Sequence, residues 1–310
     1  MRIAIDLQGI QSDGSRKRGI GRYSIELLKS ILANFREHEY ILCANASLTD
    51  LTTLFREELK LSNVHYFEWF APAPFDYFSK NFSYQKLATY LRTYSFSCLH
   101  ADIILITSFF EGFSDNCLHD FDLDLISTPT VSIFYDLIPL LNHKTYLNNN
   151  PEFEKYYNLK LDKLVQLDGL LTISQSAAKE IEANLDFDKS KIYNISSACN
   201  RSIFNINKNK KPSIEIQNLS PYLLYIGAGD PRKNLRGLLH AYSLLSVDLK
   251  DYKLVLAGKL LQPEINQIDE WIRMFSINPI NVIKSGFVSD EELAELYKNC
   301  SLFIFPSFHE

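Results

Sequence analysis

The stretch PYLLYIGAGDPRKN, residues 221–234, decides the fold of the second part of the chain. Its apolar run, Tyr222–Ile226, follows a proline and has the length and composition of a buried strand. A tight turn through two glycines comes next. Asp230 and Pro231 then form a favourable helix start, because proline fits the first helical turn and apolar residues recur afterwards at helical spacing. The stretch therefore predicts a strand, a glycine turn and a helix in direct succession.

Two cations, Arg232 and Lys233, fall in the first turn of that predicted helix. Cations are unfavourable there because the helix dipole is positive at its N-terminus. The same dipole, together with outward-pointing backbone N–H groups, attracts anions. The cation pair therefore predicts a phosphate or diphosphate site. On the local pattern alone a solvated basic turn is an equal alternative, because a complete glycine fingerprint is lacking.

Composition narrows the class of protein. The 310 residues are 46% hydrophobic and 22% charged, as expected for a globular chain long enough to form two domains. The net charge of −5 argues against a protein dedicated to nucleic acids. Neither a signal peptide nor a membrane span is expected, since a span needs about 20 apolar residues. Five scattered cysteines without a CxxC pair predict reduced thiols in a cytoplasmic protein, and no metal site is expected.

The first part of the chain alternates between strand and helix patterns, which predicts a mainly parallel sheet covered on both faces. Strands are expected at Arg2–Leu7, Tyr40–Ala44, Val64–Phe67, Ile103–Thr107, Val131–Tyr135 and Gly169–Ile173, and helices at Ile20–Phe35, Glu152–Leu167 and Gln175–Leu185. Before the first helix, Gly19 and Gly21 permit a close turn, and Arg22 is one of four neighbouring cations. This loop resembles half of a dinucleotide-binding fingerprint, and a mobile basic loop is the alternative.

The polar, lysine-rich segment 205–220 interrupts this rhythm. It is the predicted linker between an N-terminal domain, residues 1–204, and a C-terminal domain, residues 221–310. The second domain resumes the alternation, with strands expected at Tyr222–Ile226, Lys253–Ala257, Val282–Lys284 and a last buried strand at Leu302–Phe305, helices at Asn234–Leu245 and Pro263–Phe275, and a capping box at Ser289 that opens a helix to Cys300. No helix follows the last strand, so we expect the second domain to be incomplete.

Two doubly wound domains in tandem bind ligands where the carboxyl ends of their sheets face each other. The loops that follow the predicted strands are expected to bring together Gly19–Arg22, Glu111, Asp136, Arg232, Lys233 and Glu310. The alternative role of Asp136 is an Asx turn or a helix cap. Tyr135 is expected either at the wall of the cleft or in the core.

Six segments, in order along the chain, resemble one enzyme family. They are IAIDLQGIQ…RGIGRYSIELL, FYDLIPLL, LLTISQSAAKEI, YIGAGDPRKNLRGLLHAY, LVLAGK and GFVSDEELAELYKNCSLFIFPSFHE. Together they resemble the retaining, nucleotide-sugar-dependent glycosyltransferases of family 4, in particular bacterial O-antigen and polysaccharide mannosyltransferases. The resemblance covers residues 1–310. It implies the GT-B architecture, an α/β fold with two Rossmann-like, doubly wound domains that face each other across a cleft.

The resemblance implies a catalytic set of three residues. Arg232 and Lys233 match the cations that hold the donor diphosphate, where they would offset the charge of the departing nucleoside diphosphate. Glu310 matches the first acid of a Glu-x7-Glu motif, which holds hydroxyl groups of the donor sugar. The second acid of that motif would lie beyond residue 310, so these 310 residues are expected to lack part of the set.

Other positions match the family as binding residues. The donor-binding set implied by the resemblance is Gly19, Gly21, Asp136 and Val288, where the glycines approach the donor phosphates and the backbone around Val288 lies beside the nucleotide base. Residues implied at the acceptor or the cleft wall are Arg22, Glu111 and Tyr135. Two positions depart from the family: Tyr135 stands where many relatives have a histidine, and Ala228 with Gly229 stands where the family often has an arginine.

The resemblance implies a retaining hexosyltransferase without a cofactor, which moves mannose from GDP-mannose to a polysaccharide or lipid-linked glycan. The aromatic segment 67–84 is expected to pack beneath a long loop of the first domain, with peripheral contact with the inner face of the cytoplasmic membrane as the alternative. The other functions left open are a sugar-nucleotide-binding scaffold without turnover, a UDP-sugar-dependent transferase, and a GT-B epimerase or phosphorylase. A dinucleotide-dependent oxidoreductase is less favoured, because no complete GxGxxG occurs with a ribose-binding acid.

Overall fold

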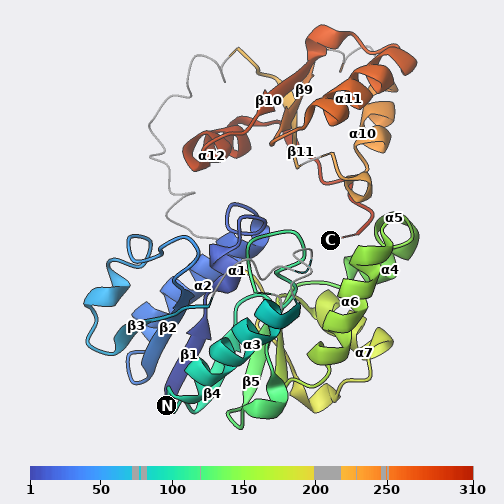
Figure 1. Cartoon of the computed structure of the whole chain (residues 1–310). Helices are drawn as coiled ribbons and strands as arrows, with labels where there is room; N and C mark the ends of the chain where they lie inside the picture. The colour runs from blue at the N-terminus through green and yellow to red at the C-terminus, as the bar shows by residue number, and fades with distance from the viewer. Residues whose placement is uncertain are drawn as a thin grey trace. The chain divides into compact units, whose positions relative to one another are not determined.

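The computed structural model describes residues 1–71, 77, 82–118, 120–198, 218–227, 229–245, 249 and 251–309. The chain divides into two compact units, Met1–Ala198 and Cys199–Glu310, called unit 1 and unit 2 below (Figure 1). Most of the expected linker, residues 205–217, lies outside the described residues.

Unit 1 is built on a seven-stranded sheet whose described strand pairs are all parallel. Its strands are β1 (Arg2–Asp6), β2 (Glu39–Asn45), β3 (Val64–Trp69), β4 (Ile103–Ile106), β5 (Thr130–Phe134), β6 (Gly169–Thr172) and β7 (Ile192–Asn194). Their order is β3-β2-β1-β4-β5-β6-β7. The direction of winding reverses between β1 and β4, and the carboxyl ends of strands at such a point are where doubly wound sheets bind ligands.

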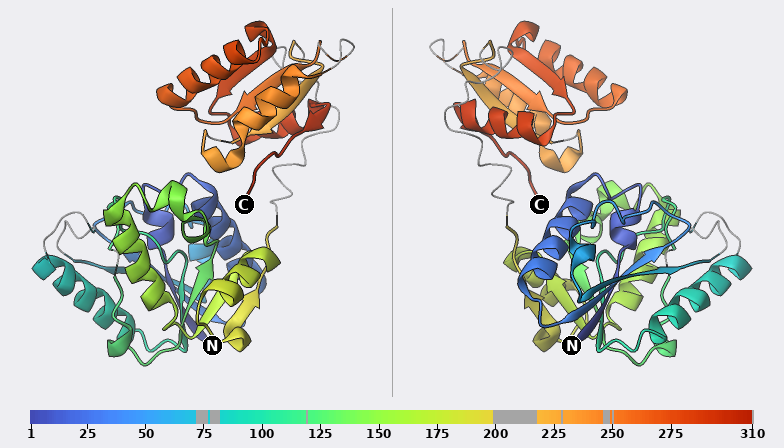
Figure 2. Two further views of the ribbon diagram at one scale, coloured as in Figure 1. Left: turned by 90° about the vertical axis from the view of Figure 1, so that its right-hand side faces the viewer. Right: turned by 90° about the vertical axis from the view of Figure 1, so that its left-hand side faces the viewer.

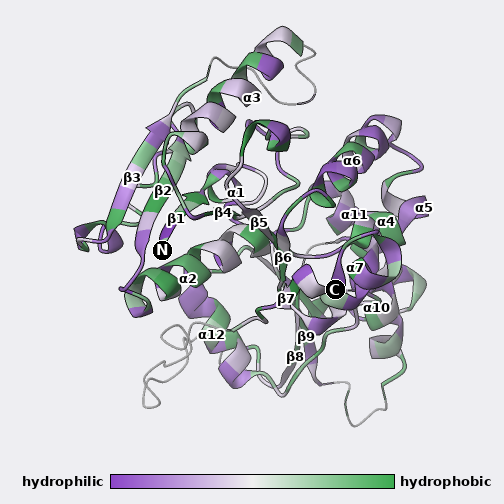
Figure 3. Cartoon of the chain, turned by 90° about the horizontal axis from the view of Figure 1, so that it is seen from below, coloured by the Kyte–Doolittle hydropathy of each residue, from purple (hydrophilic) through white to green (hydrophobic). Residues whose placement is uncertain are grey.

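Helices cover both faces of the unit 1 sheet, as the alternating pattern predicts (Figure 2). They are α1 (Gln8–Gln11), α2 (Gly19–Asn34), α3 (Phe82–Ser97), α4 (Ile138–Leu141), α5 (His143–Tyr146), α6 (Pro151–Leu164) and α7 (Gln175–Asn184), with 3-10 turns η1 (Glu58–Lys60), η3 (Leu123–Leu125) and η4 (Lys189–Lys191). Side chains alternate between the faces: Ala4 packs in the cluster that includes α3, α6 and α7, whereas Ile5 packs with α2. Helices such as α6 carry hydrophobic and hydrophilic residues side by side (Figure 3).

Unit 2 has a smaller parallel sheet in the order β10-β9-β8-β11. Its strands are β8 (Tyr222–Ile226), β9 (Lys253–Ala257), β10 (Val282–Gly286) and β11 (Leu302–Phe303), its helices are α10 (Leu235–Ser243), α11 (Gln262–Met274) and α12 (Asp290–Asn299), and its 3-10 turns include η5 (Pro231–Lys233) and η7 (Pro279–Asn281). Residues of α10 and α11 pack in one core cluster, and α12 packs in another. The predicted capping box is confirmed: Ser289 Oγ accepts from the Glu292 N–H at 3.2 Å, and the Glu292 carboxylate accepts from the Ser289 N–H at 2.7 Å.

The expected last strand, Leu302–Phe305, is shorter and less buried than the sequence indicated. Only Leu302–Phe303 is extended in the ladder, and Leu302 is 57% exposed. Within the described residues β11 pairs with β8 alone and forms an edge of the sheet. An edge strand has one unpaired side, so its apolar residues are covered less than those of a central strand.

Candidate functional site

The predicted anion site follows β8, and its backbone differs from the expected helix start. Pro231–Lys233 forms the turn η5, and α10 begins only at Leu235. Asn234 separates the two with a φ of 54°, in the left-handed region that asparagine tolerates better than most residues. The expectation that Arg232 and Lys233 lie in the first turn of an α-helix is therefore wrong. Both cations lie instead in a capped 3-10 turn at the carboxyl end of β8.

The cations of η5 are tied to the segment that follows β11. Arg232 donates from Nη1 to the carbonyl oxygen of His309 at 3.2 Å. Lys233 Nζ lies 5.2 Å from the centre of the Phe305 ring, within cation–π range. Because β8 and β11 are neighbours in the sheet, these contacts join the loops at their carboxyl ends. The predicted Glu310 follows His309 directly and lies outside the described residues.

Two carboxylates hold the backbone of this loop. Asp230 Oδ1 accepts from the Arg232 N–H at 2.9 Å, and Asp230 Oδ2 lies 3.6 Å from Arg232 Nε. Glu264, near the start of α11, accepts from the Gly229 N–H through Oε1 at 3.1 Å. These two loop N–H groups, which the sequence suggested would face an anion, therefore bond to carboxylates of the chain itself. The sequence pattern gave no indication of Glu264.

Three glycines, Gly227, Gly258 and Gly286, stand at the carboxyl ends of β8, β9 and β10 and are called the glycine edge below. The Gly258 N–H donates to the Gly286 carbonyl oxygen at 2.9 Å. A Cβ atom at Gly258 would lie 2.4 Å from the Gly227 carbonyl oxygen, and the Gly258 φ of 138° also favours glycine. This edge therefore presents bare backbone. Val288 follows it and packs, half-buried, against the core cluster of α12.

A pocket of about 710 Å³ lies between α10 and α11, beside the Gly229 loop. Trp271 of α11 and Phe275, which follows α11, give the pocket apolar walls. Arg236 and His240 of α10 and the carboxylates of Asp230 and Glu264 make the rest of its lining polar. Such a volume is typical of a small-molecule site. The sequence analysis did not predict this pocket. The aromatic residues Trp271 and Phe275, four positions apart on one predicted helix, were the available signal.

The two predicted glycines of unit 1 stand in different surroundings. A Cβ atom at Gly21 would lie 2.5 Å from the Ser15 carbonyl oxygen and 2.6 Å from Arg16 Cα, so Gly21 permits the loop before α2 to fold against the helix. A Cβ atom at Gly19 would meet nothing within 4 Å. Gly19 begins α2, and Arg22 is exposed in the same first turn.

Glu111 lies beside this loop, at the carboxyl end of β4. Its Oε1 accepts from Ser15 Oγ at 2.7 Å and from Ser108 Oγ at 2.8 Å, and the side chain is buried. Burial raises the pKa of Glu111, and the serine hydroxyl groups act in the opposite direction. The structure thus joins two predicted regions, the glycine loop and Glu111, through a hydrogen bond that spans 96 positions.

Tyr135 and Asp136 follow β5. The Tyr135 hydroxyl lies 2.7 Å from Ser24 Oγ and 3.2 Å from the carbonyl oxygen of Ile20, so it fastens the first turns of α2 to the sheet. Burial raises the pKa of Tyr135 well above its ordinary value. Asp136 Oδ1 accepts from the N–H of Ile138, two positions further on, at 2.9 Å, which is the Asx turn expected as one alternative role of Asp136.

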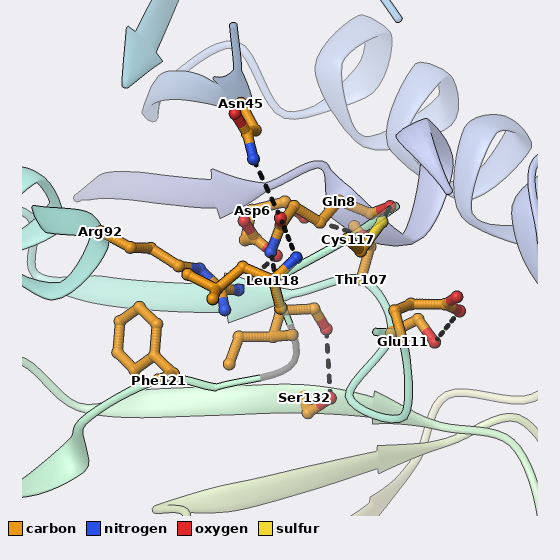
Figure 4. A network of polar contacts seen from close by, with 12 residues as sticks. Asp6, Gln8, Asn45, Arg92, Thr107, Glu111, Cys117, Leu118, Phe121 and Ser132 are labelled. Atoms are coloured by element: carbon orange, nitrogen blue, oxygen red, sulfur yellow. Dashed lines mark hydrogen bonds and ion pairs between the residues drawn. The ribbon is translucent and has the colours of Figure 1, made fainter. Parts of the chain in front are cut away.

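A buried polar network near Glu111 was not predicted from the sequence (Figure 4). Arg92 of α3 is 4% exposed and donates from Nη2 to Asp6 Oδ2 at 3.0 Å, where Asp6 is fully buried at the end of β1. Lys160 of α6 is also buried, with Nζ 4.1 Å from the centre of the Phe109 ring, and burial lowers the pKa of Lys160 to about 7. Helix α3, which supplies Arg92, was not predicted, so the pair could not be anticipated.

Comparison with known proteins gives a family and several relatives. The family described as glycosyl transferases group 1 matches residues 206–310. The chain is 33% identical over 320 residues to the serotype-specific mannosyltransferase WbdA of Escherichia coli, an alignment that covers all of this chain and 38% of WbdA. It is 40% identical over 98 residues to the O-antigen chain mannosyltransferase B of Escherichia coli, covering 29% of this chain and 23% of that protein. The chain therefore spans less than half the length of WbdA.

Solved structures share the fold. The Anabaena protein HepE, crystallised with UDP and glucose, matches 99% of this chain and 74% of its own with a TM-score of 0.63 at 13% identity. Sucrose-phosphate synthase from Thermosynechococcus elongatus matches 100% and 76% with a TM-score of 0.65, also at 13% identity. At such identities the likeness concerns the α/β architecture, which agrees with the predicted fold class.

Proposed function

We propose that this chain, whose residues 206–310 match the family described as glycosyl transferases group 1, transfers a hexose from a nucleoside-diphosphate sugar to a glycan acceptor. Mannose from GDP-mannose is the donor that we favour, because WbdA, to which the whole chain aligns, is named a mannosyltransferase. The observation that carries the proposal is the cationic turn of Arg232 and Lys233 at the carboxyl ends of β8 and β11. The acceptor class that we favour is a polysaccharide or a lipid-linked glycan.

The glycine edge and the cationic turn suit the two ends of such a donor. A Cβ atom at Gly286 would meet nothing within 4 Å, so the end of the glycine edge nearest Val288 permits a flat ligand to approach closely, which suits the nucleoside, with the backbone near Val288 beside the base. Arg232 and Lys233 would then hold the diphosphate, since a guanidinium contacts phosphate through two N–H groups and an ammonium acts as a point charge. In unit 1, Gly19 and Gly21 are the proposed donor-binding glycines.

The reaction that we propose retains the configuration at the sugar. The bond between the anomeric carbon and the phosphate oxygen breaks, and a bond forms from the acceptor hydroxyl oxygen to the same face of that carbon. The hydroxyl proton passes to the departing phosphate oxygen, so atoms and charge balance. Arg232 and Lys233 would stabilise the negative charge that grows on the diphosphate, which is the main electrostatic demand of this step. Glu310 is the proposed contact to the hydroxyl groups of the donor sugar.

Unit 1 is the proposed acceptor side. The buried hydrogen bonds of Glu111 suit it to shaping the loop before α2 rather than to exchanging protons in solution. Tyr135 similarly fixes α2, and Asp136 forms an Asx turn just before α4. We therefore assign Glu111 and Tyr135 positioning roles, with Asp136 and the exposed Arg22 as the proposed contacts to donor or acceptor.

Contact with a membrane surface is proposed for α3. Half of the aromatic segment 67–84, residues 72–76 and 78–81, lies outside the described residues, and Trp69 within the segment is buried in the core. The exposed face of α3, called the α3 outer face, begins with Phe82 and Tyr84 of this segment and continues with Leu87, Tyr90 and Tyr94. Helix α3 contains no acidic residue, and Lys86 lies over the Tyr90 ring. Tyrosines beside a cation suit the lipid headgroup region, where an apolar ring and a polar hydroxyl both find partners.

The test of the catalytic proposal is calorimetric titration of the chain with GDP-mannose, UDP-glucose, GDP and UDP. We expect selective binding of GDP-mannose, and the double variant Arg232→Ala, Lys233→Ala should weaken that binding at least about tenfold, because it removes two charge-assisted contacts. The turn η4 supplies a matched control, because Lys189 and Lys191 are its first and last residues and because η4, like η5, is a 3-10 turn that an aspartate caps. The variant Lys189→Ala, Lys191→Ala should bind like the wild type. A preference for UDP sugars would contradict our choice of donor, and undiminished binding by the Arg232, Lys233 variant would contradict the assigned site.

A further inference from the structure

Glu264 connects two loops at the carboxyl end of the unit 2 sheet. Its Oε2 accepts from the Leu261 N–H at 2.6 Å, as the third residue of a helix does when it caps its own N-terminus. Its Oε1 accepts from the Gly229 N–H at 3.1 Å, across 35 positions of sequence. One carboxylate therefore serves both the start of α11 and the loop that precedes Arg232.

Helix α12 shows that a glutamate can cap a helix without a bond to a distant loop such as the one from the Gly229 N–H. Glu292 stands at the same position of its helix and accepts from the Ser289 N–H at 2.7 Å. Among the residues that the structure describes, Glu292 has no counterpart of the Gly229 contact. The bond from Gly229 to Glu264 is thus an additional feature of the β8 loop.

The loop is shaped to receive this carboxylate. A Cβ atom at Gly229 would lie 2.7 Å from Cγ, Cδ and Oε1 of Glu264, so any other residue at position 229 would push the side chain away. Glu264 also lines the pocket between α10 and α11, next to Gln267 and Trp271. That pocket gives the side chain a place to move to if its bond to Gly229 is broken.

We propose that the Glu264 carboxylate competes with the diphosphate of the donor for the Gly229 N–H, and so sets the affinity of the site. The inference rests on the proposed function, which places the diphosphate beside Arg232. A phosphate oxygen and a carboxylate oxygen are both hydrogen-bond acceptors, and the single N–H group of Gly229 cannot form a full hydrogen bond to both at once. Two like charges at that distance also repel each other. Diphosphate binding therefore displaces Glu264 from Gly229 toward the pocket, and release of the diphosphate restores the bond. Glu264 is a positioning residue in this scheme.

The experiment compares the wild type, Glu264→Gln, Glu264→Asp and the control Glu292→Gln by calorimetric titration with inorganic pyrophosphate and with GDP at fixed ionic strength. Glutamine removes the charge and can still cap α11. Aspartate keeps the charge but is one methylene too short to bridge both N–H groups. We expect Glu264→Gln to bind about fivefold more tightly, which corresponds to one ordinary hydrogen bond, Glu264→Asp to bind more tightly than the wild type, and Glu292→Gln to bind like it.

A second measurement follows hydrogen exchange of the Gly229 amide in the same proteins. Exchange should accelerate in both Glu264 variants and stay unchanged in Glu292→Gln. Equal binding by all four proteins would overturn the inference and leave the proposed function intact. Tighter binding by Glu264→Gln alone would indicate that overall charge, and not competition for the N–H, is responsible, which also overturns it. Absence of binding in all four proteins would overturn the inference together with the proposed donor site.

Discussion

At the scale of single residues, the two glycines in the first turn of α2 differ in why a glycine stands there. Gly21 has the Ser15 carbonyl and the Arg16 backbone within about 2.6 Å of where a Cβ atom would lie, whereas Gly19 faces open space. The sequence placed both in one phosphate-approaching loop, because spacing reveals where glycines stand and not what they face. The structure shows that Gly21 is required by the fold of unit 1 itself.

The first prediction compares alanine at these two positions. Gly21→Ala should lower the free energy of unfolding by roughly 2 kcal/mol or more, because the methyl group would overlap rigid backbone. Gly19→Ala should leave it unchanged or raise it by up to about 1 kcal/mol, because alanine favours a helix more than glycine does. Urea unfolding of both variants measures the difference, and equal effects would contradict the assigned packing.

The second prediction concerns Lys160 and pH. Its pKa is about 7 in the folded chain, against about 10.4 in an unfolded one. Between these values the unfolded chain binds a proton that the folded chain does not, so this residue makes stability rise with pH. Relative to Lys160→Met, the wild type should gain about 2 kcal/mol in free energy of unfolding between pH 7 and pH 9. Denaturant titrations of both proteins at the two pH values measure this gain; parallel curves would show that Lys160 keeps an ordinary pKa.

At the scale of elements, strands and helices could be predicted from the sequence where their hydrophobic residues follow the regular pattern of a buried element. The strands β8 and β9 occupy the predicted residues without any shift, since short apolar runs bounded by proline and glycine mark a buried strand clearly. Helix α3 was missed because its pattern is inverted: Gln85, Thr89 and Arg92 are buried, whereas Tyr90 and Tyr94 are exposed. The turn η5 was read as a helix start because the left-handed Asn234 has no reliable sequence signal.

The inverted pattern of α3 leads to the third prediction. If the α3 outer face contacts lipid, the variant Tyr90→Ser, Tyr94→Ser should reduce sedimentation of the chain with phosphatidylglycerol-containing vesicles roughly threefold or more. Tyr94 is 69% exposed, so the change should leave the fold unaffected. The matched control is Tyr193→Ser, Phe287→Ser, which removes two exposed aromatic side chains elsewhere. If vesicle binding is unaffected and the variant instead disrupts a dimer in solution, the face joins two copies of the chain.

At the scale of the whole molecule, the sequence anticipated two doubly wound units because strands and helices alternate through both parts of the chain. Each unit has its own pair of core clusters, one on each face of its sheet. The described site residues stand at the carboxyl ends of the strands, Arg232 after β8 and Glu111 after β4, where doubly wound folds place their chemistry. Contacts such as Glu264 to Gly229 were beyond prediction, because they depend on the three-dimensional approach of two loops and not on any local pattern.

The glycine edge has an evolutionary consequence. At Gly258 a single methyl group would collide with the neighbouring backbone. Almost every substitution of Gly258 would therefore destabilise the fold and be removed by selection. If this edge receives the nucleoside, a lineage that acquires a different donor must do so through residues that flank Gly258, such as those around Val288, while position 258 stays glycine. Variation in donor choice among descendants of this protein would then be recorded beside that one position.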